Sequence, residues 1–150
     1  KLVFFMLLIS FIDIYFNIMN IKSSKELVKE ANETIKIMSP EQVKSSYDKG
    51  EVTLIDIRDI RELWKEGTIK NAVHIPRGML EFWLDPQSSY YQEKKIGNAK
   101  NLVLFCALGL RSALATKTLK EMGFDNVANA EGGFDSLKKV GFKVIPKEKK

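Results

Sequence analysis

Hydrophobic and polar positions alternate in short blocks from Ser23 onward, and the period of the pattern changes from block to block. Four short apolar runs, most of them rich in β-branched or aromatic residues, predict buried strands. They are VTLIDI at 52–57, AVHIP at 72–76, LVLF at 102–105 and VANA at 127–130. The stretches between them are longer and more polar, and several carry helix start and stop signals.

Two helix starts are marked by capping residues. Ser23 with Glu26 predicts a helix that runs through about Ile37, and Ser39-Pro40 with Gln42 predicts a second helix that ends near Gly50. Shorter helices are predicted at RELWKEG, at Ser112–Met122 with an apolar stripe, and at GGFDSLKKVG. Strands that alternate with helices predict an α/β fold, with a parallel central sheet of about five strands and helices on both faces.

The first residues do not share this pattern. The run Leu2–Ile12 follows Lys1 and is long enough for a signal-peptide core, but Asp13 and Asn17 interrupt the apolar sequence beyond it. We therefore interpret residues 1–22 as a hydrophobic leader, an anchor or an upstream extension, with a natural start near Met19 favoured. The remaining division is an N-terminal helix at 23–38, an α/β domain at 39–141 and a basic tail at 142–150.

Composition narrows the classes of function. A chain of 150 residues with 45% hydrophobic residues supports one domain with a core. The net charge is +5, but the basic residues are interspersed with acidic ones along the chain. This distribution argues against binding of nucleic acid and favours small anionic partners. One cysteine and one histidine exclude an internal disulfide and the usual zinc sites, so we expect no metal site. A reduced thiol favours a cytoplasmic location; the alternative is membrane anchoring or export through residues 1–21.

The lone cysteine stands in the segment CALGLR, at the carboxyl end of the strongest predicted strand, where ligands bind in such sheets. A buried, inert thiol is one interpretation of Cys106. The other is a nucleophile. The backbone N–H groups of the loop, Gly109 with its access to positive φ, the following helix and Arg111 all favour the thiolate and lower the pKa of Cys106.

Four stretches in order resemble a single-domain rhodanese, a sulfurtransferase homology domain. They are LIDIR at 54–58, ELWKEGTIKNAVHIPRG at 62–78, LVLFCALGLRSALA at 102–115 and MGFDNVANAEGGFDSL at 122–137. This resemblance implies a ping-pong transfer in which Cys106 takes a sulfur atom from a donor such as thiosulfate, holds it as a persulfide and passes it on. The implied partners are a small anionic donor and an acceptor that is a thiol, cyanide or a protein. The implied mechanism needs no metal or organic cofactor.

The resemblance also assigns the site residues. Cys106 and Arg111 are the expected catalytic residues, with Arg111 orienting the loop and attracting the donor. The expected substrate-binding residues are the loop and two further arginines: Ala107, Leu108, Gly109, Leu110, Arg58 and Arg77. For Arg58 a structural role is the stronger expectation, because buried charges are usually paired.

Two alternatives remain at this point. A rhodanese-like binding or sulfur-carrier module would turn over small donors poorly; Thr68, in a place where the family often has histidine, and the apolar Leu108 and Leu110 leave room for it. The related dual-specificity phosphatases carry five residues between cysteine and arginine. This chain has four, and the shorter loop favours a sulfur atom over a phosphate.

Overall fold

The strand β5 (Leu102–Phe105) is buried along its whole length and lies at the centre of a five-stranded sheet. The strand order is β1-β6-β5-β2-β4, and every pairing in this sheet is parallel. The computed structural model describes residues 1–19, 21–96 and 101–149. The predicted α/β fold with a parallel sheet of about five strands is confirmed.

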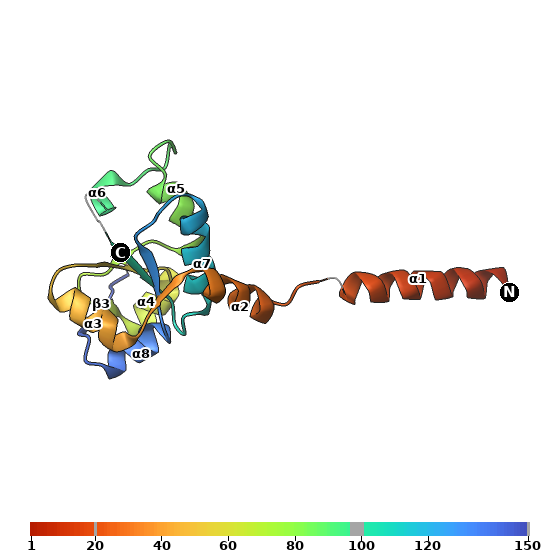
Figure 1. Ribbon diagram of the computed structural model, residues 1–150, viewed down its shortest axis with the longest axis horizontal. Helices are drawn as coiled ribbons and strands as arrows, with labels where there is room; N and C mark the ends of the chain where they lie inside the picture. The colour runs from red at the N-terminus through yellow and green to blue at the C-terminus, as the bar shows by residue number, and fades with distance from the viewer. Residues whose placement is uncertain (20, 97–100, 150) are drawn as a thin grey trace.

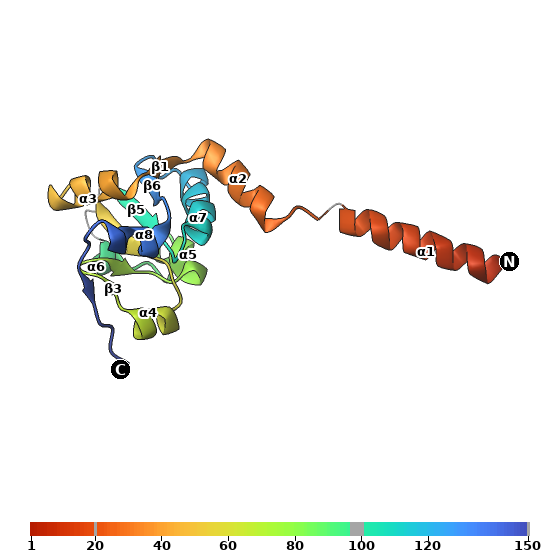
Figure 2. The same ribbon diagram turned by 90° about the horizontal axis from the view of Figure 1, so that it is seen from below.

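The elements follow one another along the chain in this order: α1 (Leu2–Met19), α2 (Ser24–Thr34), β1 (Lys36–Met38), α3 (Pro40–Asp48), β2 (Thr53–Asp56), α4 (Ile60–Glu66), β3 (Thr68–Ile69), β4 (Val73–His74), the 3-10 helix η1 (Arg77–Met79), α5 (Leu80–Leu84), α6 (Glu93–Ile96), β5, α7 (Leu110–Glu121), β6 (Val127–Ala130), α8 (Gly133–Lys139) and β7 (Val144–Ile145). Figures 1 and 2 show the sheet between helices, with α7 and α8 on different sides of it.

The alternation of side chains along the strands divides the core in two. Leu54, Val103 and Phe105 face one layer, where they pack with residues of α3 and α8. Ile55 and Leu104 face the other layer, where α5 and α7 cover them. Because both faces of the central strands are covered, these strands are apolar throughout, which explains why the sequence marked them so clearly.

Two sequence predictions are corrected at the edges of the domain. The helix predicted to reach Ile37 ends at Thr34, and Lys36–Met38 form the edge strand β1 beside β6. The basic tail predicted from residue 142 begins only after Ile145, because Phe142 is buried and β7 pairs antiparallel with β3. In both places a two- or three-residue strand depends on a partner distant in sequence.

Helix α1 projects away from the domain in both views (Figures 1 and 2). Its large apolar side chains from Leu2 to Ile9 are exposed. Within the described residues, no helix combines the length and apolar character that crossing a membrane requires.

Candidate active site

Cys106 directly follows the central strand, and its thiol is almost completely buried, with 1% of the residue exposed. Hydrogen-bond donors from the loop and from α7 reach the sulfur atom. The backbone N–H of Gly109 donates to Sγ at 3.2 Å, and the buried hydroxyl of Ser112 lies 3.5 Å from it. Burial by itself raises the pKa of the Cys106 thiol, but the Ser112 hydroxyl and backbone N–H groups of the loop outweigh it, so the pKa lies below its ordinary value. The arrangement therefore favours the thiolate, as the sequence predicts.

The loop conformation depends on Gly109, which immediately precedes α7. It has a φ of 88°, in the left-handed region that favours glycine. The side chain of Asn129, on strand β6 and only 4% exposed, donates from Nδ2 to the Gly109 carbonyl oxygen at 3.1 Å. This bond helps to hold the residue whose N–H points at the sulfur. Sequence reasoning missed Asn129, since nothing local marks a buried asparagine within a short strand as a loop partner.

The turn at the start of α8 holds the other side of the loop. The backbone N–H of Phe134 donates to the Cys106 carbonyl oxygen at 2.7 Å, and that of Asp135 donates to the Ala107 carbonyl oxygen at 3.2 Å. A Cβ at Gly133 would lie 2.4 Å from the Cys106 carbonyl oxygen, so the close approach requires glycine. With these carbonyl groups engaged on one side, N–H groups of the loop are left to face the sulfur.

Arg111 forms a two-pronged ion pair with Glu62 of α4. Its two terminal nitrogens donate to the carboxylate oxygens of Glu62 at 2.7 and 2.8 Å. Glu62 also accepts a hydrogen bond from the backbone N–H of Asp59, which closes the N-terminal capping box of α4. The ion pair raises the pKa of Arg111, to which the nearby Cys106 thiolate adds, and it lowers the pKa of Glu62. Arg111 thus ties the start of α7 to α4 while its charge stays near the nucleophile.

The expectation that Arg58 binds substrate is wrong. Its side chain is completely buried and pairs with the buried Asp56, the closest contact being 2.7 Å. The guanidinium also donates to the Gly67 carbonyl oxygen at 2.8 Å and stacks over the Phe134 ring at 3.8 Å. Thr68, where the family often has histidine, completes the cluster by donating to Asp56 at 2.7 Å. Arg58 joins α4 to the turn beneath the reactive loop and has no surface left for a ligand.

Of the other predicted substrate-binding residues, Gly109 is buried, Ala107 and Arg77 are half-buried, and the two leucines are exposed. Leu108 and Leu110 expose 58% and 56% of their area. Arg77 lies beyond the carboxyl end of β4 and pairs with Glu81 at 2.5 Å, which ties it to α5 rather than to the loop. Substrate binding by Arg77, Ala107, Leu108, Gly109 and Leu110 stays a prediction.

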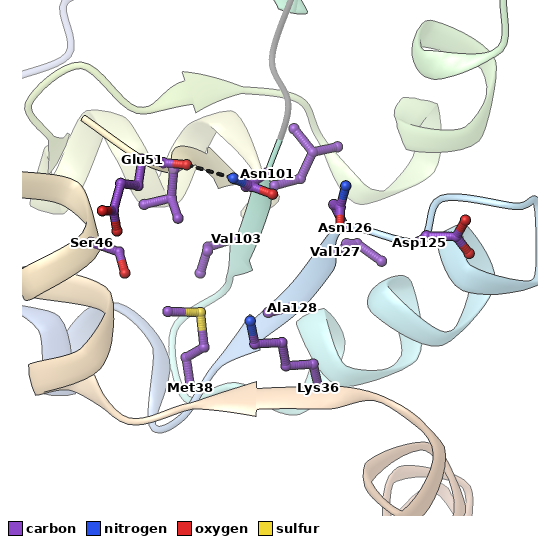
Figure 3. Close-up of a pocket in the computed structure, with 12 residues that line it drawn as sticks. Lys36, Met38, Ser46, Glu51, Asn101, Val103, Asp125, Asn126, Val127 and Ala128 are labelled. Atoms are coloured by element: carbon purple, nitrogen blue, oxygen red, sulfur yellow. Dashed lines mark hydrogen bonds between the residues drawn. The ribbon is translucent and has the colours of Figure 1, made fainter. Parts of the chain in front are cut away.

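A cavity of about 200 Å³ lies at the amino ends of β5 and β6 (Figure 3). Lys36, Ser46, Glu51 and Asn101 line it, and Asn101 donates to the backbone of Glu51 at 2.8 Å. Cys106 follows the opposite, carboxyl end of β5, so this cavity is separate from the thiol. Among the residues that the structure describes, no group of three acidic, histidine or cysteine side chains gathers as metal ligands.

Comparison with known proteins places this geometry in a family. The family model described as a rhodanese-like domain matches residues 39–139, which is more than half of the chain. A solved polysulfide-sulfur transferase from Wolinella succinogenes is 33% identical, with 83% of this chain and 88% of that chain covered and a TM-score of 0.62.

Two further relatives differ in what their descriptions say. A solved protein from Rhodopseudomonas palustris, of unknown function and described as a possible tyrosine phosphatase, is 38% identical, covers 83% of this chain and 95% of its own, and has a TM-score of 0.76. The tRNA uridine(34) hydroxylase of Photorhabdus laumondii is 28% identical over 69% of this chain. The chain spans only 28% of that hydroxylase, so the match covers one part of a larger protein.

Proposed function

Because this chain belongs to the rhodanese-like domain family, we propose that it is a sulfurtransferase that carries a sulfur atom as a persulfide on Cys106. One observation carries the proposal: the buried Cys106 sulfur accepts hydrogen bonds from the Gly109 N–H and the Ser112 hydroxyl. These donors stabilise a thiolate without a histidine base.

In the first half of the reaction, the Cys106 thiolate attacks the outer sulfur of an anionic donor such as thiosulfate. A bond forms between Sγ and that sulfur while the bond from the outer sulfur to the sulfonate sulfur breaks, and sulfite leaves with the electron pair. The enzyme then holds Cys106–S–S⁻. The thiolate and thiosulfate together carry three negative charges, and the products carry the same three, one on the persulfide and two on sulfite. Unused N–H groups of a strand–loop–helix turn stabilise such a terminal charge.

In the second half, an acceptor thiolate or cyanide attacks the terminal sulfur of the persulfide. The new bond forms as the bond from Cys106 Sγ to the terminal sulfur breaks, and Cys106 returns as a thiolate. Arg111 supports both halves by keeping the start of α7 in place through Glu62 and by adding positive charge near the sulfur. The donor and the acceptor approach Cys106 over the rim of the reactive loop, which is formed by Ala107, Leu108 and Leu110.

A second candidate function is that of a sulfur-carrier module that serves a protein partner. The exposed Leu108 and Leu110 favour it, because an apolar rim suits a protein surface better than a dianion does. A phosphatase is a third possibility, suggested by the description of the Rhodopseudomonas relative. The four-residue spacing between Cys106 and Arg111 favours sulfur over phosphate.

The test is formation of thiocyanate from thiosulfate and cyanide by the full chain. We expect parallel double-reciprocal plots, the signature of a ping-pong reaction, and complete loss in Cys106→Ser. A matched control moves the thiol: Cys106→Ser combined with Ser89→Cys places the single cysteine at an exposed position, and this variant should stay inactive. Persulfide formation without turnover would favour the carrier, and hydrolysis of p-nitrophenyl phosphate would favour the phosphatase.

A further inference from the structure

A groove of about 280 Å³ runs between α2 and α7, beside the reactive loop. Figures 1 and 2 both show these two helices side by side. Its lining comes from α2 and from the first turns of α7: Ser24, Lys25, Val28, Leu110, Arg111 and Leu114. Helix α2 precedes residues 39–139, so one wall of the groove lies outside the matched family domain.

The groove is continuous with the reactive loop. Leu110 and Arg111 line it and also close the CALGLR segment that begins at the nucleophile. The guanidinium of Arg111 pairs with Glu62, and it lies near enough to Cys106 for the thiolate charge to raise its pKa as well. A molecule whose reacting atom meets Cys106 can therefore extend its remaining atoms along α2.

The lining defines the chemistry of the occupant. Val28, Leu110 and Leu114 are apolar, and Leu110 keeps 56% of its area exposed. Lys25 adds a positive charge, and it forms no ion pair within the described residues of the domain. The groove volume of about 280 Å³ lies just below the range for ligand pockets, about 300–1,000 Å³, which fits a small molecule rather than a protein segment. An apolar arm with an anionic end matches all three properties.

We propose that this groove binds the apolar arm of the sulfur acceptor, a small aliphatic thiol that ends in a carboxylate. The inference rests on the proposed sulfur transfer. The thiolate of the acceptor takes the terminal sulfur from the Cys106 persulfide, its methylene chain lies against Val28 and Leu114, and its carboxylate approaches Lys25. The product is the alkyl persulfide, and Cys106 is released as the thiolate.

The first experiment uses the unmodified full chain and varies the length of the acceptor. The acceptors are 2-mercaptoacetate, 4-mercaptobutanoate and 6-mercaptohexanoate, with thiosulfate as donor and cyanide as an acceptor without an arm. Complete burial of one methylene corresponds to about a fourfold gain in kcat/KM, so burial of half of the four additional methylenes predicts a gain of roughly fifteenfold for the longest acid over the shortest. 6-Mercaptohexanol, which lacks the charge, should react less well than 6-mercaptohexanoate.

Variants then locate the effect. Val28→Asp should remove most of the chain-length gain, each acceptor being normalised to the cyanide rate of the same variant. Leu27→Asp introduces the same charge one position away on α2, at a side chain that is 41% exposed and outside the groove, and should keep the gain. Val28→Trp fills the groove without adding charge and serves if Val28→Asp fails to fold. Lys25→Gln should abolish the advantage of the carboxylate over the alcohol.

The outcomes separate this inference from the proposed function. Transfer to cyanide with no dependence on chain length overturns the groove assignment alone. Absence of transfer to any acceptor, cyanide included, overturns both. A chain-length gain that persists in both Val28 variants places the arm elsewhere and overturns the assignment. If Val28→Asp changes the oligomeric state of the protein in solution but not its acceptor preference, the groove is a contact between copies of the chain. That outcome also contradicts the assignment.

Discussion

Removing the Ser112 hydroxyl tests how the protein keeps its nucleophile ionised. Ser112 is completely buried, and its Oγ lies 3.5 Å from the Cys106 sulfur. In Ser112→Ala the thiolate loses this donor but keeps the Gly109 N–H at 3.2 Å. The pKa of Cys106 should therefore rise.

The magnitude follows from the geometry of the contact. A hydrogen bond to a charged group contributes about 1.5–3 kcal/mol, and a long contact to sulfur belongs at the lower end of that range. A loss of about 1.4 kcal/mol lowers the ratio of thiolate to thiol roughly tenfold at any given pH. On the acid side of the titration, Cys106 should react about tenfold more slowly with a thiolate-specific reagent. On the alkaline plateau the two proteins should react at similar rates.

The assay is the rate of alkylation by iodoacetamide from acid to alkaline pH, followed by intact mass. The chain has one cysteine, so every adduct reports on Cys106. Thr118→Ala is the matched control on the same helix, because its hydroxyl donates to the Leu114 carbonyl oxygen and not to sulfur. An alkylation profile that moves equally in both variants, or one that moves to lower pH in Ser112→Ala, would refute the assignment of Ser112 as a donor to the thiolate.

Three further changes probe the support of the loop. Arg58→Met should lower the free energy of unfolding by about 3–5 kcal/mol, measured by urea denaturation, because it leaves the Asp56 carboxylate buried without its partner. Gly133→Ala should reduce thiocyanate formation about a hundredfold by displacing the Cys106 carbonyl group, whereas Gly123→Ala, which meets no atom within 4 Å, should stay active. The lowered pKa of Glu62, due first to Arg111, stabilises the fold above pH 4.5, and this contribution is lost as pH falls through the folded-state pKa. Urea titrations against pH should show a smaller acid loss in Glu62→Gln, and an unchanged loss would contradict the role of the ion pair.

Local signals predicted the reactive segment well. The run LVLF, the glycine of the loop and the helix behind it follow one another directly in the sequence, and the structure places them as β5, Gly109 and α7. The sheet was predictable for a related reason: its central strands are covered on both faces and are therefore apolar throughout.

Contacts between distant residues were beyond the reach of these signals. Glu62 lies 49 residues from Arg111, and Asn129 lies 20 residues from Gly109, so neither partner could be identified from spacing. The residues of β1 continue the apolar pattern of the preceding helix α2, and their pairing with β6 makes them a strand. Arg58 matched a family motif in sequence, but only the fold shows that its guanidinium pairs with Asp56 and donates to the Gly67 carbonyl oxygen.

The most direct test of the central claim is the intact mass of the full chain after brief exposure to thiosulfate and removal of the excess. Transfer through Cys106 predicts a gain of one sulfur atom that cyanide removes with formation of thiocyanate, and no gain in Cys106→Ser. A chain that gains no sulfur from thiosulfate or from any persulfide donor, or a gain that persists in Cys106→Ser, would contradict it.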